Sequence, residues 1–149
     1  MRKTFALVLA GIPLAATAES YGTGDIQILD PVAHETPASA MAGAGYFQIV
    51  NSGEAPDRLI AVRADFPRVM MHDTVVEDGI ASMRHLDAVG LDPGEEVIFE
   101  PGGKHIMFMG LAGDPFVAGE EIPATFIFEN SGEIDIVFTV IPADHQHGH

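Results

Sequence analysis

The chain has 149 residues, no cysteine and a formal net charge of −15, with 22 acidic side chains against seven basic ones. A surface this acidic repels the phosphates of nucleic acids and anionic lipid head groups, so we expect no nucleic-acid partner. The same charge favours cations or a protein with a basic patch. Without cysteine, both disulfides and thiolate metal sites are excluded.

The N-terminus has the pattern of a secretory signal. The basic pair Arg2-Lys3 precedes the apolar run Phe5–Pro13, and Ala16-Thr17-Ala18 matches an A-x-A cleavage site. The run is too short to span a bilayer comfortably, and no later segment is long and apolar enough, so we expect no stable membrane insertion. We therefore expect export to the periplasm, one mature domain over residues 19–142 and a flexible His-rich tail over residues 143–149.

Short apolar runs separated by Gly- and Pro-rich turns follow one another along the mature domain, and no stretch has a convincing helical period. A turn of helix over residues 38–44 is disfavoured by its glycines. The density of runs predicts an all-β protein, an antiparallel β-sandwich or small barrel. The predicted strands are Ile26–Leu29, Gly45–Asn51, Leu59–Ala64, Val69–Val75, Ala81–Leu86, Val97–Glu100, His105–Met109, Ala124–Glu129 and Ile134–Ile141, of which the last two form a closing hairpin.

One predicted strand carries unusual outward-facing side chains. Alternation places Ile106 and Phe108 on one face and His105, Met107 and Met109 on the other. Isoleucine and phenylalanine are the better core residues. We therefore expect the histidine and both methionines to point away from the core.

A predicted hairpin brings His72 and Met83 together. If Glu77-Asp78 forms the tip, His72 lies directly opposite Met83; if Asp78-Gly79 does, His72 faces His85 and Met83 is its diagonal neighbour. Both registers leave the three side chains on one face, whereas a slip of one residue would separate them.

These two segments supply an unusual set of donors, two imidazoles and two thioethers. Thioether sulfur is soft and uncharged, so it binds zinc, calcium and magnesium poorly but copper(I) well. The pattern therefore indicates a copper(I) carrier; the alternative is two surface histidines and two methionines in ordinary packing. The candidate ligands, at the spacing H-x10-M-x21-H-x-M, are His72, Met83, His105 and Met107.

Several other residues are candidates for lesser roles. Met109 and Met70 would shield the copper from water, while Met71 is expected in the core and His34 in a surface loop. The tail histidines suit copper(II), and also zinc or nickel, although a flexible segment binds more weakly than a prearranged site. The candidate secondary ligands are His145, His147, His149 and His85.

At this spacing the chain resembles the PCuAC family of periplasmic copper chaperones. The resemblance covers roughly residues 22–141 and includes His72-Asp73-Thr74, Pro101-Gly102-Gly103 and the strand 125–129. It implies a cupredoxin-like, Greek-key antiparallel β-sandwich that binds one copper(I) through the four candidate ligands. It also implies delivery to an acceptor, typically the CuA centre on subunit II of cytochrome c oxidase or another assembly factor. His85 departs from the family, in which proline is more usual after Met-Arg.

Three other functions compete with that of a copper chaperone. An electron-transfer copper protein usually needs a cysteine thiolate, and no Ser/His/Asp or Cys/His arrangement is recognisable, so we do not expect an enzyme. A periplasmic copper buffer would use the same ligands as a chaperone, and the sequence does not separate the two. A structural sandwich without metal is the third reading. We expect a monomer.

Overall fold

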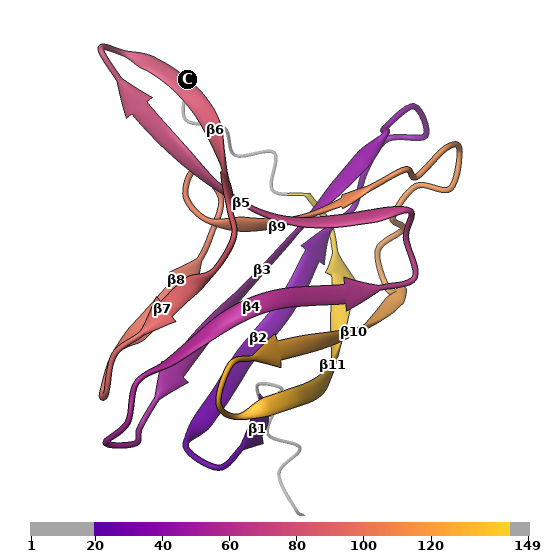
Figure 1. The fold of residues 1–149 in the computed structure, drawn as a ribbon. Coiled ribbons are helices and arrows are strands. Elements are labelled where there is room, and N and C mark those ends of the chain that lie inside the picture. The colour runs from indigo at the N-terminus through magenta and orange to yellow at the C-terminus, as the bar shows by residue number, and fades with distance from the viewer. Residues whose placement is uncertain (1–19, 144–149) are drawn as a thin grey trace, which may run out of the picture.

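The computed structural model describes residues 20–143, which form eleven β-strands and no helix (Figure 1). The predicted all-β class is therefore confirmed. The predicted signal segment and the tail histidines His145, His147 and His149 lie outside the described residues. The strands are β1 Ser20–Thr23, β2 Ile26–His34, β3 Ala42–Asn51, β4 Asp57–Ala64, β5 Arg68–Glu77, β6 Ile80–Leu86, β7 Val89–Leu91, β8 Glu96–Phe99, β9 His105–Met109, β10 Glu121–Phe128 and β11 Gly132–Ile141.

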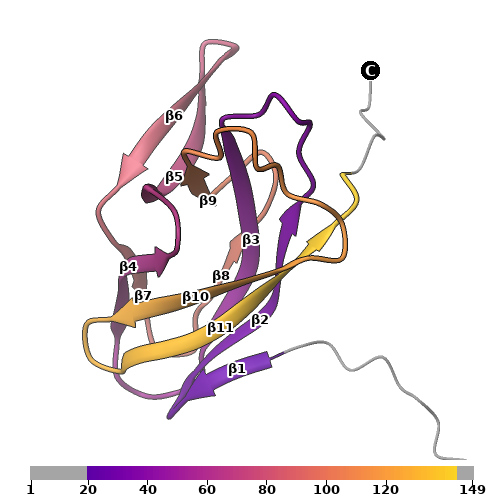
Figure 2. The ribbon, with the colours of Figure 1, turned by 90° about the vertical axis from the view of Figure 1, so that its right-hand side faces the viewer.

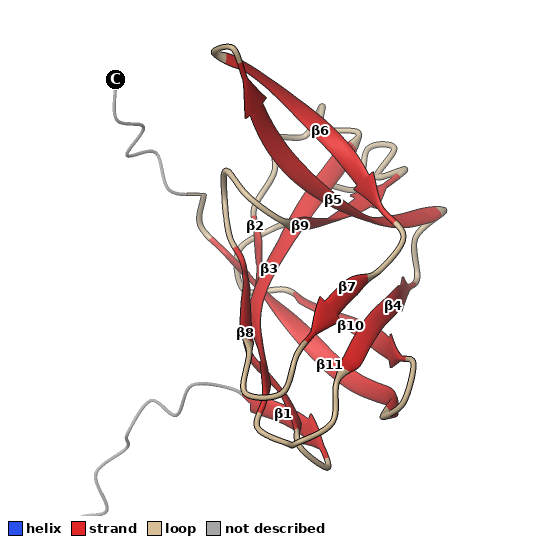
Figure 3. Ribbon diagram, turned by 60° about the vertical axis from the view of Figure 1, so that its left-hand side comes forward, coloured by secondary structure: helices blue, strands red, loops and turns tan. Residues whose placement is uncertain are grey.

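Hydrogen bonds join the strands in the order β6-β5-β9-β3-β2-β11-β10-β4-β7, with β1 added on β2 and β8 on β3. The sheet folds over on itself, so that β10 and β4 face the layer made by β3, β2 and β8 (Figures 2 and 3). The strand pairs are antiparallel except β2 with β11, where Val32 pairs with Thr139 and His34 with Ile141. The predicted sandwich is confirmed, and this parallel pair joins its two layers.

Aromatic side chains fill the space between the layers. Phe47 of β3 stacks on Phe99 of β8 with ring centroids 4.3 Å apart, and Phe108 of β9 meets Phe138 of β11 at 5.4 Å. The predicted inward face of the closing hairpin is confirmed, because all four of its residues are buried: Ile134, Ile136, Phe138 and Val140. Alternation along the strands thus places the core where the sequence predicts it.

Glycines let β3 lie directly against this aromatic layer. A Cβ atom on Gly43 would come within 2.3 Å of the Phe116 ring, and one on Gly45 within 3.0 Å of Phe108 and Phe138. Real Cβ atoms do not approach so closely, so these two positions accept no side chain without repacking. Contact with these rings therefore fixes how close the backbone of β3, which pairs with β9, lies to the aromatic layer.

Strand β2 is longer than predicted. Pro31 would normally end a strand, but a bulge at Asp30, whose φ is 50°, lets pairing with β3 resume at Val32. The prediction that His34 lies in a surface loop was therefore wrong, because His34 is the last residue of β2. Two short strands, β1 and β7, were also missed.

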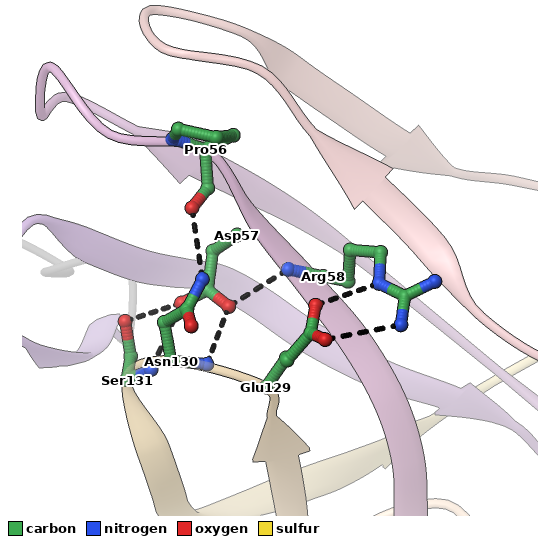
Figure 4. Close-up of polar contacts among 6 residues, drawn as sticks. All are labelled: Pro56, Asp57, Arg58, Glu129, Asn130 and Ser131. Atoms are coloured by element: carbon green, nitrogen blue, oxygen red, sulfur yellow. Dashed lines mark hydrogen bonds and ion pairs between the residues drawn. The ribbon is translucent and has the colours of Figure 1, made fainter.

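A buried carboxylate ties the β10–β11 turn to the start of β4 (Figure 4). Asp57 accepts hydrogen bonds from the backbone N–H groups of Arg58, Asn130 and Ser131 and from the Ser131 hydroxyl. Burial alone would raise the pKa of Asp57, but these donors, led by the Ser131 hydroxyl, outweigh it and hold that pKa below its ordinary value. Next to these hydrogen bonds, Glu129 pairs with the Arg58 guanidinium at 2.8 Å on the surface.

Over residues 20–143, no helix has the length and apolar character needed to cross a membrane.

Candidate metal centre

Three histidines stand side by side on the neighbouring strands β6, β5 and β9. His72 of β5 pairs directly with His85 of β6 and with His105 of β9. The ring centroids are 6.0 Å apart for His72 and His85 and 5.7 Å apart for His72 and His105, with the planes nearly perpendicular in both cases. The imidazoles therefore form a row across the sheet, next to the Met71–Leu86 end of the β5–β6 pairing. The β5–β6 hairpin itself projects from the sandwich (Figure 1).

The turn of this hairpin decides between the two predicted registers. Glu77 pairs with Ile80, so Asp78 and Gly79 form the tip, with φ angles of 52° and 77°. Positive φ at both central residues is typical of a type I′ turn, which suits the twist of a tight hairpin. His72 consequently faces His85.

Met83 takes the diagonal place beside His72. It lies opposite Thr74, and because successive side chains alternate, Met83 and His72 share one face of the hairpin. Met83 is 62% exposed. The placement predicted for the second register is therefore found, and the thioether lies open to solvent.

Met107 occupies the next row along the same face. On β9 it pairs with Met70 of β5 on one side and with Ala44 of β3 on the other, and it is half-buried. Met109 lies one row further, opposite Arg68. Both methionines considered as shields thus flank Met107, while Met71 is 5% exposed and belongs to the core as predicted.

His105 is more enclosed than alternation suggests. Ile106 and Phe108 are fully buried, as predicted, but His105 on the opposite face is also only 5% exposed. The His72 ring covers one side of His105, and the Gly103 carbonyl lies 3.2 Å from its Nδ1 atom. The sequence did not identify this role of Gly103, although the Pro101-Gly102-Gly103 turn before the strand was a signal for it.

The imidazoles have nitrogens without partners. A carbonyl oxygen only accepts hydrogen bonds, so the bond to Gly103 requires a proton of His105 on Nδ1, and in the neutral ring the lone pair is then on Nε2. That Nε2 atom is buried and makes no hydrogen bond, and the same holds for Nδ1 of His72. Buried polar atoms normally have a partner, so these two nitrogens fit a metal ion that would satisfy both.

Electrostatics also favour neutral imidazole at His72. Burial lowers the pKa of His72, and the neighbouring His105 and His85 lower it further because two imidazolium ions would repel each other. Charged side chains occupy the opposite face of the hairpin, where Asp73 lies 3.7 Å from Lys104 and Glu77 lies 3.9 Å from Arg84. On the face with the histidines and methionines, the charged side chains are Arg68, opposite Met109, and the exposed Asp87 beside His85.

The donor types restrict what this face can hold. Among residues 20–143, no group of three or more His, Cys, Asp or Glu side chains is arranged to hold a metal ion. A hard-metal centre of carboxylates is therefore absent from the described part of the chain. Two imidazoles with two neighbouring thioethers form a softer set, which suits copper(I).

Comparisons with known proteins agree with this architecture. The LpqE-like family model matches residues 26–140. The copper-bound PCuAC domain from PmoF2 is 29% identical with a TM-score of 0.70, covering 84% of this chain and 99% of that one. The apo PmoF2 PCuAC domain is 27% identical with a TM-score of 0.71, covering 87% of this chain and 100% of that one.

A more distant structure shares the fold. Apo-DR1885 from Deinococcus radiodurans is 18% identical with a TM-score of 0.63, and the match covers 99% of both chains. No curated protein sequence matches the chain. The fold predicted from the resemblance is confirmed by these structures.

Proposed function

The chain belongs to the LpqE-like family and has a PCuAC domain, and from this membership we propose that it binds copper(I) and passes it to an acceptor protein. The observation that carries the proposal is the pair of unpartnered imidazole nitrogens, Nδ1 of His72 and Nε2 of His105, on a face that also presents thioethers. The copper-bound state of the PmoF2 domain supports it.

Each of the four ligands has a distinct place in this mechanism. His72 and His105 supply fixed nitrogens from adjacent paired strands, and Met107 adds a half-buried thioether from β9. Met83 is the exposed ligand, so an acceptor's donor atom would replace it first. Four neutral donors leave copper(I) with a single positive charge, and stepwise replacement of one weak donor at a time allows transfer without loss to water. Met70 and Met109 would exclude water beside Met107.

The wider setting of the function is also part of the proposal. The N-terminal pattern directs the chain to the periplasm, where the signal would be cleaved near Ala18. The acceptor would be the CuA centre of cytochrome c oxidase subunit II or another assembly factor, and the protein would act as a monomer and not as an enzyme. The tail would provide a second site, suited to copper(II), through His145, His147 and His149.

A competitive titration with a chromogenic copper(I) chelator tests binding. We expect one equivalent of copper(I) to bind tightly to the wild-type protein and binding to weaken at least about tenfold in His72→Ala. The matched control is His34→Ala, which removes a half-buried histidine on β2 outside the four-ligand set. Equal affinity in the wild-type protein and His72→Ala would contradict the proposed ligands.

Transfer distinguishes delivery from its alternative, a periplasmic buffer that sequesters excess copper. The copper(I)-loaded protein is mixed with the soluble CuA domain of an oxidase, and copper is followed after the two proteins are separated. If the protein is a chaperone, its copper should reach the acceptor faster than it is released into solution, where a competing chelator would capture it. Retention of copper in the presence of the acceptor would favour the buffer.

A further inference from the structure

His85 adds a third imidazole to the face that carries the proposed copper(I) ligands. It stands directly opposite His72, which in turn stands directly opposite His105, so the three rings follow one line across β6, β5 and β9. The central ring of His72 lies 6.0 Å from one neighbour and 5.7 Å from the other. The four-ligand copper(I) site uses only two of these rings, and the third belongs to His85, which the sequence indicated only as a candidate secondary ligand.

Three imidazoles suit a different oxidation state from two imidazoles and two thioethers. Copper(II) prefers nitrogen and oxygen donors in a square-planar or tetragonal arrangement, whereas thioether sulfur favours copper(I). Met83 and His85 both come from β6, two residues apart on the same face, and both are exposed. The same strand therefore offers His72 either a soft or a harder neighbouring donor.

His85 must turn before it can share a metal ion with His72. Its Nε2 atom lies 3.2 Å from Asp87 Oδ1. Within residues 20–143, the three imidazoles do not already converge on a common point. Both partners of that contact are solvent-exposed, the His85 side chain at 51% and the Asp87 side chain at 98%. Exposed pairs of this kind contribute little, and exposed side chains change rotamer rapidly, so the contact opposes the rotation only weakly.

We propose that His72, His85 and His105 form a three-imidazole site for copper(II), in which His85 replaces Met83 as the ligand from β6. This inference rests on the proposed copper(I) function, because both modes share His72 and His105. It involves binding alone and no electron transfer. The protein would then accept copper in either oxidation state on one face, with β6 providing the donor that differs.

Electron paramagnetic resonance of the copper(II)-loaded protein, together with affinities for both ions, tests this inference. The full-length chain is used with His145, His147 and His149 all changed to alanine, so that tail imidazoles do not contribute nitrogen signals. We expect splitting from three nitrogens, reduced to two in His85→Ala, with copper(II) affinity lower by about tenfold or more. Met83→Leu should show the reverse selectivity, losing copper(I) affinity while keeping the three-nitrogen spectrum.

His34→Ala serves as the histidine control, and it should leave the spectrum and both affinities unchanged. A His85→Ala protein with the same spectrum and copper(II) affinity as the protein that lacks only the tail histidines would overturn the inference. So would the absence of copper(II) binding in the protein that lacks only the tail histidines. Neither result would affect the proposed function, whose failure is recognised separately by the absence of copper(I) binding in that same protein.

Discussion

His105 donates its Nδ1–H to the carbonyl oxygen of Gly103 across 3.2 Å, and this bond determines which nitrogen of the ring is available. Because the acceptor is a backbone carbonyl, the lone pair of the neutral ring lies on Nε2, the atom that has no partner. The turn before β9 thus orients a candidate ligand as well as connecting two strands.

This hydrogen bond predicts the tautomer of the apo protein. Nitrogen-detected NMR of the histidine rings at neutral pH should show His105 protonated at Nδ1, and diamagnetic copper(I) should shift the Nε2 resonance. His34, which packs on Tyr46 at a centroid distance of 4.9 Å, should not shift with copper. An apo protein with the His105 proton on Nε2 would contradict the assignment.

Met83→Leu should separate copper binding from stability. Leucine preserves most of the volume but removes the sulfur, and the side chain is 62% exposed, so the unfolding free energy should change by no more than about 0.5 kcal/mol. Copper(I) affinity, measured by chelator competition, should fall at least about tenfold.

The control for this variant is Met41→Leu, which makes the same change at a methionine 67% exposed and outside the ligand set. It should alter neither copper(I) affinity nor the thermal unfolding midpoint. Equal affinity losses in the two variants would mean that general surface change, and not ligation by Met83, is responsible.

The hairpin shows how far the sequence determined the candidate site. Alternation alone placed His72, Met83 and His85 on one face, and the structure agrees. Alternation did not choose between the two turns, because each preserves that face. The choice depends on backbone angles at Asp78 and Gly79, both with positive φ, which are a property of the folded turn.

The burial of His105 was harder to predict than the face of the sheet on which it lies. His105 points to the outer face as expected, yet it is buried because the preceding turn and the His72 ring cover it. Such cover comes from residues on other segments, which periodicity within one strand does not describe. The predicted length of strand β2 was too short for a similar reason, since the bulge at Asp30 that accommodates Pro31 depends on the pairing of β2 with β3.

Asp57→Asn should destabilise the protein at neutral pH by about 1–3 kcal/mol. The amide NH₂ of asparagine would then face the backbone N–H and the hydroxyl of Ser131, which now donate to a carboxylate oxygen. The folded pKa of Asp57 lies below its ordinary value of about 3.9, so the folded state binds its proton only at lower pH than the unfolded state. The carboxylate's contribution is therefore complete above about pH 4 and is lost as the pH falls through the folded pKa.

Urea unfolding of the wild-type and Asp57→Asn proteins between pH 7 and pH 3 measures this dependence, and the difference between them should narrow in acid. Glu129→Gln is the control, since it breaks only the surface pair with Arg58 and should change stability much less. A difference that stays constant down to pH 3 would show that the carboxylate charge is not involved.

Gly43→Ala should lower the unfolding free energy by about 1–3 kcal/mol, because its Cβ would lie 2.3 Å from Phe116 and force the aromatic layer apart. Gly90→Ala is matched to it, as a strand glycine with nothing within 4 Å of the added Cβ, and should be nearly neutral. Chemical denaturation of both variants tests whether β3 depends on this close approach.

The parallel pair of β2 and β11 has a consequence for how the molecule is made. Val32 must meet Thr139, and His34 must meet Ile141, across more than a hundred residues of chain, a separation that slows folding. Strands β5, β6 and β9, which bear the histidines and methionines, are synthesised before β11 exists. A chain cut short within its last strand would hold every histidine and methionine of the candidate site and still lack the strand that joins the two layers.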